Sequence, residues 1–212
     1  MRMGRYIVAR IAQLVLTPVM LRRGTTRAMH GIRVTVIADA VVASGLFETV
    51  DRALALIQQF DARRHRRLTR DVRRILVYEW PLTLGSGGLY SHRLRMIQLN
   101  ATVLREYGSG AWVSAALALV HEATHARIQL TSREYATRPE RDRIREERAC
   151  TNAELDFVRR LPDPALLEAA VLEKFTGLDE GYSDAERAKR SFAVIAELRR
   201  ELRELWTALR RQ

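Results

Sequence analysis

Residues 111–130 read AWVSAALALVHEATHARIQL. The first ten are apolar nearly all round, and a helix of this composition belongs in the interior of a protein. His121 and His125 are four residues apart, so both imidazoles leave the same face of the helix, one turn apart. Glu122 is rotated by about 100° from His121. The stretch therefore predicts a buried helix that presents two histidines and a glutamate together.

The residue types and their spacing are typical of a zinc site. Two neutral imidazole nitrogens can bind one Zn²⁺ at about 2.0–2.1 Å, so we expect His121 and His125 to be metal ligands and Zn²⁺ to be the cofactor. Glu122 would stand beside a metal-activated water and accept its proton, as the catalytic base. The opposing interpretation is a pair of core histidines with a salt-bridged glutamate.

A third ligand is expected on the helix predicted over residues 139–161. On a helical wheel Glu146 falls within the apolar arc, where a lone carboxylate is costly unless a cation meets it. Glu147 falls near the edge of the arc, four residues after Arg143, and an ordinary surface pair would account for it. We therefore predict Glu146 as the third ligand, with Glu154 as a weaker candidate and the thiolate of Cys150 as an alternative.

The run Glu146-x-x-Ala149-Cys150, together with HEATH, resembles the gluzincin family of zinc peptidases over about residues 75–160. Those proteins carry HExxH on one helix and a glutamate, often within ExxAD, on the next. The resemblance implies peptide-bond hydrolysis, with the strand at 93–99 as an edge strand that holds extended substrate. Cys150 stands where the family usually has an aspartate that supports a zinc-binding histidine, which indicates a different orienting group or a less active site.

Zinc peptidases also stabilise an oxyanion, commonly with Tyr, His or Arg. Tyr182, in the loop GLDEGYSD at 177–184, is our first candidate for that group, because the loop could cover a cleft. Tyr135, His92 and Tyr90 are the others. For each of the four, simple packing or surface exposure is the competing interpretation.

The N-terminus, MRMGRYIVARIAQLVLTPVML, places arginines and polar residues on one stripe and apolar residues mostly opposite, as in an amphipathic helix. We expect it to pack on the core of the domain, and peripheral contact with an anionic membrane is the alternative. The predicted organisation is an N-terminal unit, 1–33, made of this helix and a connection, followed by a zincin-like catalytic domain, 34–212, with C-terminal helices.

The expected fold class is α+β, mostly helical, with a small β-sheet before the HExxH helix. Helical spacing covers about 34–60, in two pieces broken near Ser44-Gly45, and the arginine-rich 63–74 is a solvated helix end or loop. Strands are predicted at 75–78 and along 89–100. Further helices are expected at about 164–175 and from Ser183 onward.

The composition limits the partners and the compartment. The net charge is +11, carried almost wholly by arginine, but no aromatics interleave with the basic clusters, so we expect no nucleic-acid partner. The single cysteine fits a reducing compartment, which favours a cytoplasmic protein, with membrane association as the alternative. The expected partner is a peptide or protein substrate. A rival hypothesis is a catalytically weak or inactive zincin-fold module that binds a protein partner or a membrane surface.

Overall fold

The computed structural model describes residues 21–79, 88–106, 108–131, 140–165, 167–169 and 171–172. Within them, five strands form one mixed sheet in the order β1-β2-β3-β5-β4. The strands are β1 (Thr25–Met29), β2 (Ile32–Ile37), β3 (Arg74–Tyr78), β4 (Gly88–Ser91) and β5 (Met96–Asn100). The helices are α2 (Ala40–Phe60), α3 (Ala62–Asp71), α4 (Ala101–Glu106), α5 (Ala111–Thr131) and α6 (Glu140–Val158), with a 3-10 turn, η2, at Gly108–Gly110.

The first two strands form a hairpin that the sequence analysis missed. Residues 24–33 were expected to be a connection, but β1 and β2 pair antiparallel around a two-residue turn, His30-Gly31. Both turn residues have positive φ, 49° and 80°, as the tightest hairpin turns require. The boundary that we placed between 33 and 34 therefore falls inside β2.

Helix α2 is one uninterrupted helix, so the predicted break near Ser44-Gly45 was wrong. Asp39 caps its start, because the Asp39 Oδ1 accepts a hydrogen bond of 3.0 Å from the Val42 N–H. Ser44 and Gly45 lie on the exposed face, where a glycine costs little packing. The buried face carries large apolar side chains, among them Leu46, Phe47, Val50, Leu54 and Ile57.

The arginine-rich stretch is helical as α3, which Asp61 caps through a 2.9 Å hydrogen bond from the Arg64 N–H. Its arginines at 63, 66 and 67 are exposed, while Leu68 is completely buried. The predicted solvent exposure of these arginines is thus confirmed. The stretch differs from the prediction in being a complete helix, which leads into β3.

The predicted strand over 89–100 is in fact a second hairpin. Strands β4 and β5 pair antiparallel, and Arg95 in the turn between them has a φ of 46°. The Arg95 guanidinium donates to the carbonyl oxygens of Arg70 and Asp71 at the end of α3, which holds the turn in place. As a result β5 lies inside the sheet, between β3 and β4, and the edge strand is β4 rather than the predicted 93–99.

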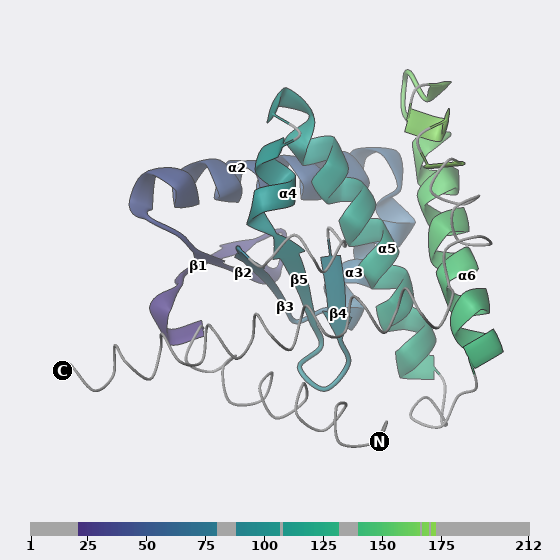
Figure 1. Ribbon diagram of the computed structural model, residues 1–212, viewed down its shortest axis with the longest axis horizontal. Helices are drawn as coiled ribbons and strands as arrows, with labels where there is room; N and C mark the ends of the chain where they lie inside the picture. Colours follow the sequence, from purple (N-terminus) through teal and green to yellow (C-terminus); the bar gives the residue numbers. More distant parts are fainter. Residues whose placement is uncertain are drawn as a thin grey trace, which may run out of the picture.

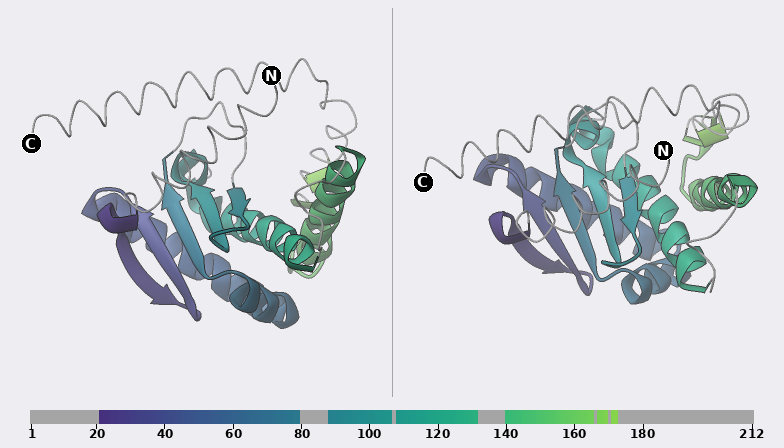
Figure 2. Two further views of the ribbon diagram at one scale, coloured as in Figure 1. Left: turned by 90° about the horizontal axis from the view of Figure 1, so that it is seen from below. Right: turned by 60° about the horizontal axis from the view of Figure 1, so that its bottom comes forward.

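The sheet carries α2, α3 and α5 on one face, and α6 lies along α5 (Figures 1 and 2). Alternate residues of the strands, including Val34, Ile75 and Ile97, join α2 and α5 in one hydrophobic core. Helix α5 contacts α2, α3, α4, α6, β4 and β5, which makes it the central helix that its all-round apolar sequence predicted. The α+β class with a small sheet is confirmed.

Several predictions fall outside the described residues: the amphipathic helix of the N-terminus, Tyr135, Tyr182 and the helix from Ser183. Within the described part of the chain, no helix has the length and the hydrophobicity needed to cross a membrane.

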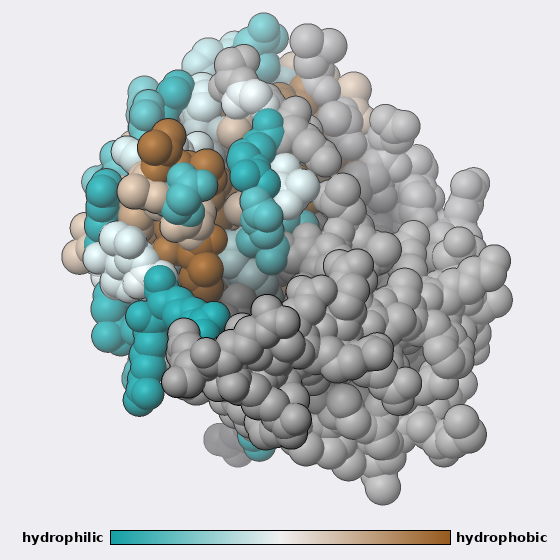
Figure 3. Space-filling view, turned by 60° about the vertical axis from the view of Figure 1, so that its left-hand side comes forward, coloured by the Kyte–Doolittle hydropathy of each residue, from teal (hydrophilic) through white to brown (hydrophobic). Residues whose placement is uncertain are grey.

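Figure 3, which turns the left side of Figure 1 forward, shows a band of hydrophobic residues between hydrophilic ones. The large hydrophobic side chains that remain exposed among the described residues are Val41, Leu89, Leu130 and Leu172.

Candidate metal centre

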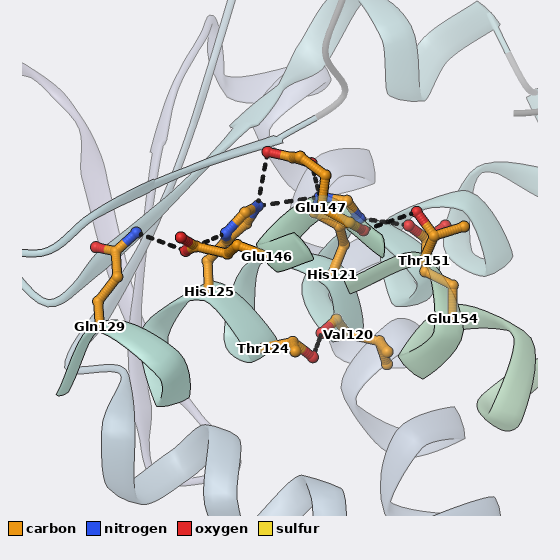
Figure 4. Close-up of polar contacts among 9 residues, drawn as sticks. All are labelled: Val120, His121, Thr124, His125, Gln129, Glu146, Glu147, Thr151 and Glu154. Carbon is orange, nitrogen blue, oxygen red and sulfur yellow. Dashed lines mark hydrogen bonds and ion pairs between the residues drawn. The ribbon is translucent and has the colours of Figure 1, made fainter. Parts of the chain in front are cut away.

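Two facing helices bring the candidate site together. Helix α6 runs antiparallel to α5, so that Glu146 meets His125 and Glu154 meets His121. Glu146, Cys150 and Glu154 recur every four residues and therefore share one stripe of α6. All three side chains are buried, with at most 5% of each residue exposed. Glu146 and Glu154, at the two ends of this stripe, face the two histidines of the HEATH motif (Figure 4).

The Nδ1 atom of each histidine contacts a buried glutamate. His125 Nδ1 lies 2.8 Å from Glu146 Oε1, and His121 Nδ1 lies 2.5 Å from Glu154 Oε1. The Gln129 amide donates a further hydrogen bond of 3.3 Å to Glu146 Oε1. A carboxylate accepts the proton that Nδ1 carries, which leaves the lone pair of a neutral imidazole on Nε2. The carboxylates thus prepare both Nε2 atoms to bind a metal ion.

The two Nε2 atoms converge on one point. They lie 3.2 Å apart, and Glu147 approaches them with its Oε2 3.3 Å from His121 Nε2 and its Oε1 3.5 Å from His125 Nε2. Tetrahedral ligands at 2.0–2.1 Å from one Zn²⁺ are separated from each other by about 3.3 Å. The spacing of these nitrogen and oxygen atoms therefore matches three ligands of one tetrahedral zinc ion.

Cys150 lies beside this cluster. Its Sγ and one nitrogen from each histidine all lie within 4.8 Å of one another, and the thiol is hydrogen-bonded to His125. Burial raises the pKa of the Cys150 thiol, which keeps it protonated and neutral.

Glu122 occupies the other side of the cluster, against the edge strand β4. Only 7% of the residue is exposed, and burial raises the pKa of its carboxyl group. The backbone N–H of Tyr90 in β4 donates a hydrogen bond to that carboxyl group. A carboxyl group with a raised pKa is suited to take up and release a proton near neutral pH.

The cluster holds more negative than positive groups. Four glutamates surround two imidazoles. Burial disfavours the charged imidazolium, yet the pKa of both rings is raised above the ordinary value: that of His121 by Glu147 and Glu154, and that of His125 by Cys150 and then by Glu146 and Glu147. Burial likewise disfavours the Glu147 carboxylate, yet the two histidines hold its pKa well below the usual range. An environment that stabilises positive charge this strongly fits a divalent cation.

The structure places the sequence candidates as follows. His121, Glu122, His125 and Glu146 are brought together, but Glu146 lies on an Nδ1 atom and not where the Nε2 atoms meet. The prediction that Glu147 is an ordinary surface residue was wrong, because its carboxylate contacts both histidines. The wheel placed it at the edge of the buried arc and took no account of how far a glutamate side chain can reach across that edge.

Two further contacts were also missed at the level of sequence. Glu154 was considered only as a weaker metal ligand, whereas it contacts His121 Nδ1. The signal was available, since Glu146 and Glu154 are two turns apart on one stripe that faces two histidines one turn apart. The contact between Glu122 and β4 could not be predicted from the sequence, because it depends on where the edge strand lies relative to α5.

The described candidates for the oxyanion group differ in position. His92 is exposed in the turn between β4 and β5. The Tyr90 side chain packs in the hydrophobic core, so the group that Tyr90 brings to the site is its backbone N–H. Neither side chain is placed against the two Nε2 atoms by any contact in the described part of the chain.

Comparison of the chain with protein-family models, with curated proteins and with solved structures gave no match. The functional interpretation therefore rests on the residues and geometry of this chain.

Proposed function

We propose that the protein is a zinc-dependent peptidase in which His121, His125 and Glu147 bind the metal and Glu122 is the catalytic base. The observation that carries the proposal is that the two Nε2 atoms lie 3.2 Å apart and that each contacts one oxygen of the Glu147 carboxylate, at 3.3 and 3.5 Å. Core histidines with incidental ion pairs have no reason to turn both Nε2 atoms to one point while glutamates occupy both Nδ1 atoms.

Each part of the site has a separate role in the proposed hydrolysis of a peptide bond. Zinc, when bound, supplies a water molecule that is acidic near neutral pH and polarises the peptide carbonyl group. Glu122 takes up the proton of the attacking water on its carboxylate and donates it to the leaving amine. Within the described residues β4 pairs only with β5, and its other edge can pair with a peptide in extended conformation and hold the peptide backbone beside Glu122. The substrate class is therefore a peptide or an extended protein segment.

The proposed ligand set revises the sequence prediction, since Glu147 replaces Glu146. Glu147→Ala removes a proposed ligand, whereas Glu146→Gln leaves the ligand set intact and weakens only the support of His125. We expect the zinc dissociation constant to rise by roughly a thousandfold for Glu147→Ala and by about 10- to 100-fold for Glu146→Gln. Dissociation constants in the reverse order would restore Glu146 as the ligand.

The hydrolysis itself is tested with Glu122→Gln. Glutamine is nearly isosteric and cannot accept the proton, so kcat should fall by about a hundredfold or more while zinc content stays near one per chain. Digestion of a broad peptide library by the zinc-loaded parent and the variant, followed by mass spectrometry, measures this. A parent that cleaves no peptide, or a variant as active as the parent, contradicts the proposal.

One observation favours a second candidate, a non-catalytic module with a closed zinc site. Cys150 is close enough to both histidines to become a fourth ligand, and four protein ligands are typical of structural zinc. The Co²⁺-substituted protein distinguishes the two, because a thiolate ligand gives an intense charge-transfer absorption that Cys150→Ser abolishes. We expect that absorption to be absent. Its presence, together with an inactive parent, would favour the module that binds a protein partner or a membrane surface.

A further inference from the structure

Gly88 is the first residue of β4, and its backbone conformation does not require a glycine. The positive-φ residues of the described chain are His30, Arg95, Gly31 and Gly108, so the conformation at position 88 is open to any residue. A glycine inside a strand weakens it and often marks a place where another group approaches closely.

The group that approaches Gly88 is Glu122. A Cβ built on Gly88 would lie 2.9 Å from Glu122 Cγ and 3.2 Å from Glu122 Oε1, and distances below 3.0 Å are essentially never found for a real Cβ. The nearest atoms to that Cβ all belong to the Glu122 side chain. The side chain of the proposed base thus fills the volume that any larger residue at 88 would need.

Tyr90, two residues further along β4, fixes the same side chain by a directional contact. Its backbone N–H donates to the Glu122 carboxyl group. Residues two apart in a strand direct their Cα–Cβ bonds to the same face of the sheet, so positions 88 and 90 both lie on the side of β4 that contacts α5. The strand therefore meets Glu122 twice, by close packing at 88 and by a hydrogen bond at 90.

We propose that Gly88 and the backbone N–H of Tyr90 are positioning groups that hold the Glu122 carboxylate in its reactive orientation. This inference rests on the proposed function, since it assigns to β4 the placement of the base for that reaction. A side chain at 88 would push the flexible glutamate aside and leave the strand and the metal ligands where they are. The expected signature is a loss of turnover without a loss of zinc or of stability.

Gly24 and Gly45 supply matched controls for the substitution of Gly88. A Cβ on Gly24 would lie 2.6 Å from Thr35 Cγ2 and 3.0 Å from the Val36 carbonyl oxygen, so alanine there strains the β1–β2 hairpin region and nothing at the site. A Cβ on Gly45 meets no atom within 4 Å. The three glycine-to-alanine variants therefore separate displacement of the base from general strain and from the substitution itself.

The experiment compares Gly88→Ala, Gly24→Ala and Gly45→Ala with the parent, all zinc-loaded. For Gly88→Ala we expect kcat to fall by up to about a hundredfold, since a misplacement of about 1 Å can have that effect. KM, the zinc dissociation constant and the urea midpoint should stay close to the parent values. Gly24→Ala should lower the urea midpoint with kcat retained. Gly45→Ala should also retain kcat and should raise the midpoint slightly, because alanine is favoured over glycine at an exposed helix position. A Gly88→Ala protein with full kcat overturns the inference.

A second measurement needs no activity. Gly88→Ala is combined with Glu122→Ala, and the urea midpoints of the metal-free parent, both single variants and the double variant form a cycle. Gly88→Ala should raise the midpoint when residue 122 is alanine, because the strand gains and nothing clashes, and should not raise it in the parent. Equal effects in both backgrounds overturn the inference and leave the hydrolysis intact. If the effect of Gly88→Ala on the midpoint depends on residue 122 but the parent cleaves no peptide, the proposed hydrolysis is contradicted, and the positioning role is contradicted with it.

Discussion

The molecule contains two pairs of packed histidine rings, and only one of them resembles a metal site. His121 and His125 lie edge to face with ring centroids 4.9 Å apart, and His30 and His65 lie in nearly the same way at 5.5 Å. The ring geometry is therefore not informative. What differs is the surroundings, because in the first pair glutamate carboxylates contact the Nδ1 and the Nε2 atoms of both rings.

The second pair has a different environment. His30 Nδ1 lies 2.9 Å from the amide oxygen of Gln58, and its Nε2 lies 3.4 Å from Asp51. Within the described residues His65 Nε2 is buried without a hydrogen-bond partner, and the pKa of His65 is lowered by burial and then by the charge of His30. At the HEATH pair the environment instead raises the pKa of both rings. The two pairs therefore differ in the carboxylates on Nδ1 and not in ring packing, and these carboxylates are the feature that would distinguish the proposed metal site from an ordinary histidine pair.

The largest test of this contrast substitutes one histidine from each pair. His125→Gln removes one of three proposed ligands, and we expect zinc affinity to fall by roughly a thousandfold, given that a complete four-ligand site gains about 10–16 kcal/mol. His65→Gln should leave zinc affinity unchanged. Competition with a chromophoric chelator measures both dissociation constants. Equal losses for the two variants would erase the distinction between the pairs.

A smaller effect is expected from the glutamate on the other HEATH ring. Glu154→Gln keeps the size of the side chain but replaces a charged acceptor of the His121 Nδ1 proton by a neutral one. Zinc affinity should fall by about 10- to 100-fold, as for other groups that orient a metal-binding histidine. Gln58→Ala, at the corresponding Nδ1 of His30, is the control and should change nothing. An unchanged affinity in Glu154→Gln would mean that the Nδ1 carboxylates do not tune the site.

The smallest effect concerns pH. The pKa of His65 is lowered in the folded protein, so the unfolded chain takes up a proton at higher pH than the folded one. His65 therefore contributes stability above its unfolded pKa of about 6.5, and this contribution is lost as the pH falls below that value. Urea midpoints between pH 8 and 5 should decline more steeply in the parent than in His65→Gln. A steeper decline in the variant would give the pKa shift the opposite sign.

The sequence predicted the helices of this fold better than its strands, for physical reasons that particular residues illustrate. Periodicity over α2 and α6 reports burial directly, and the nearly all-round apolar first half of α5 identified it as the central helix. Strand β1 is exposed at nearly every position, so it carries no alternation to read. The His30-Gly31 turn was the usable signal there. The turn before β5 contains no glycine or asparagine, and Arg95 adopts its left-handed conformation because its guanidinium is bound to the end of α3.

At the site, the sequence predicted that His121, Glu122, His125 and Glu146 assemble, but it missed Glu147 and did not predict which atoms face each other. HExxH places two rings on one face by helix geometry alone, and the wheel correctly buried Glu146. The wheel could not choose between Nδ1 and Nε2, because that choice depends on the separation and direction of α6. The antiparallel packing of α6 on α5 decides it, and so Glu147 rather than Glu146 lies against the Nε2 atoms.

The stripe of α6 has a consequence for how the two helices can slide along each other. A shift of α6 along its axis by four residues, about 6 Å, would change which residues face the histidines. Depending on the direction, Asp142 and Cys150 or Cys150 and Val158 would take the positions of Glu146 and Glu154. Either slip leaves at least one histidine facing a thiol or an aliphatic side chain. Only one of these alignments gives both rings a glutamate, so the contacts of the polar stripe fix the register of α6 on α5. The apolar contacts of an alanine-rich helix would not distinguish these alignments.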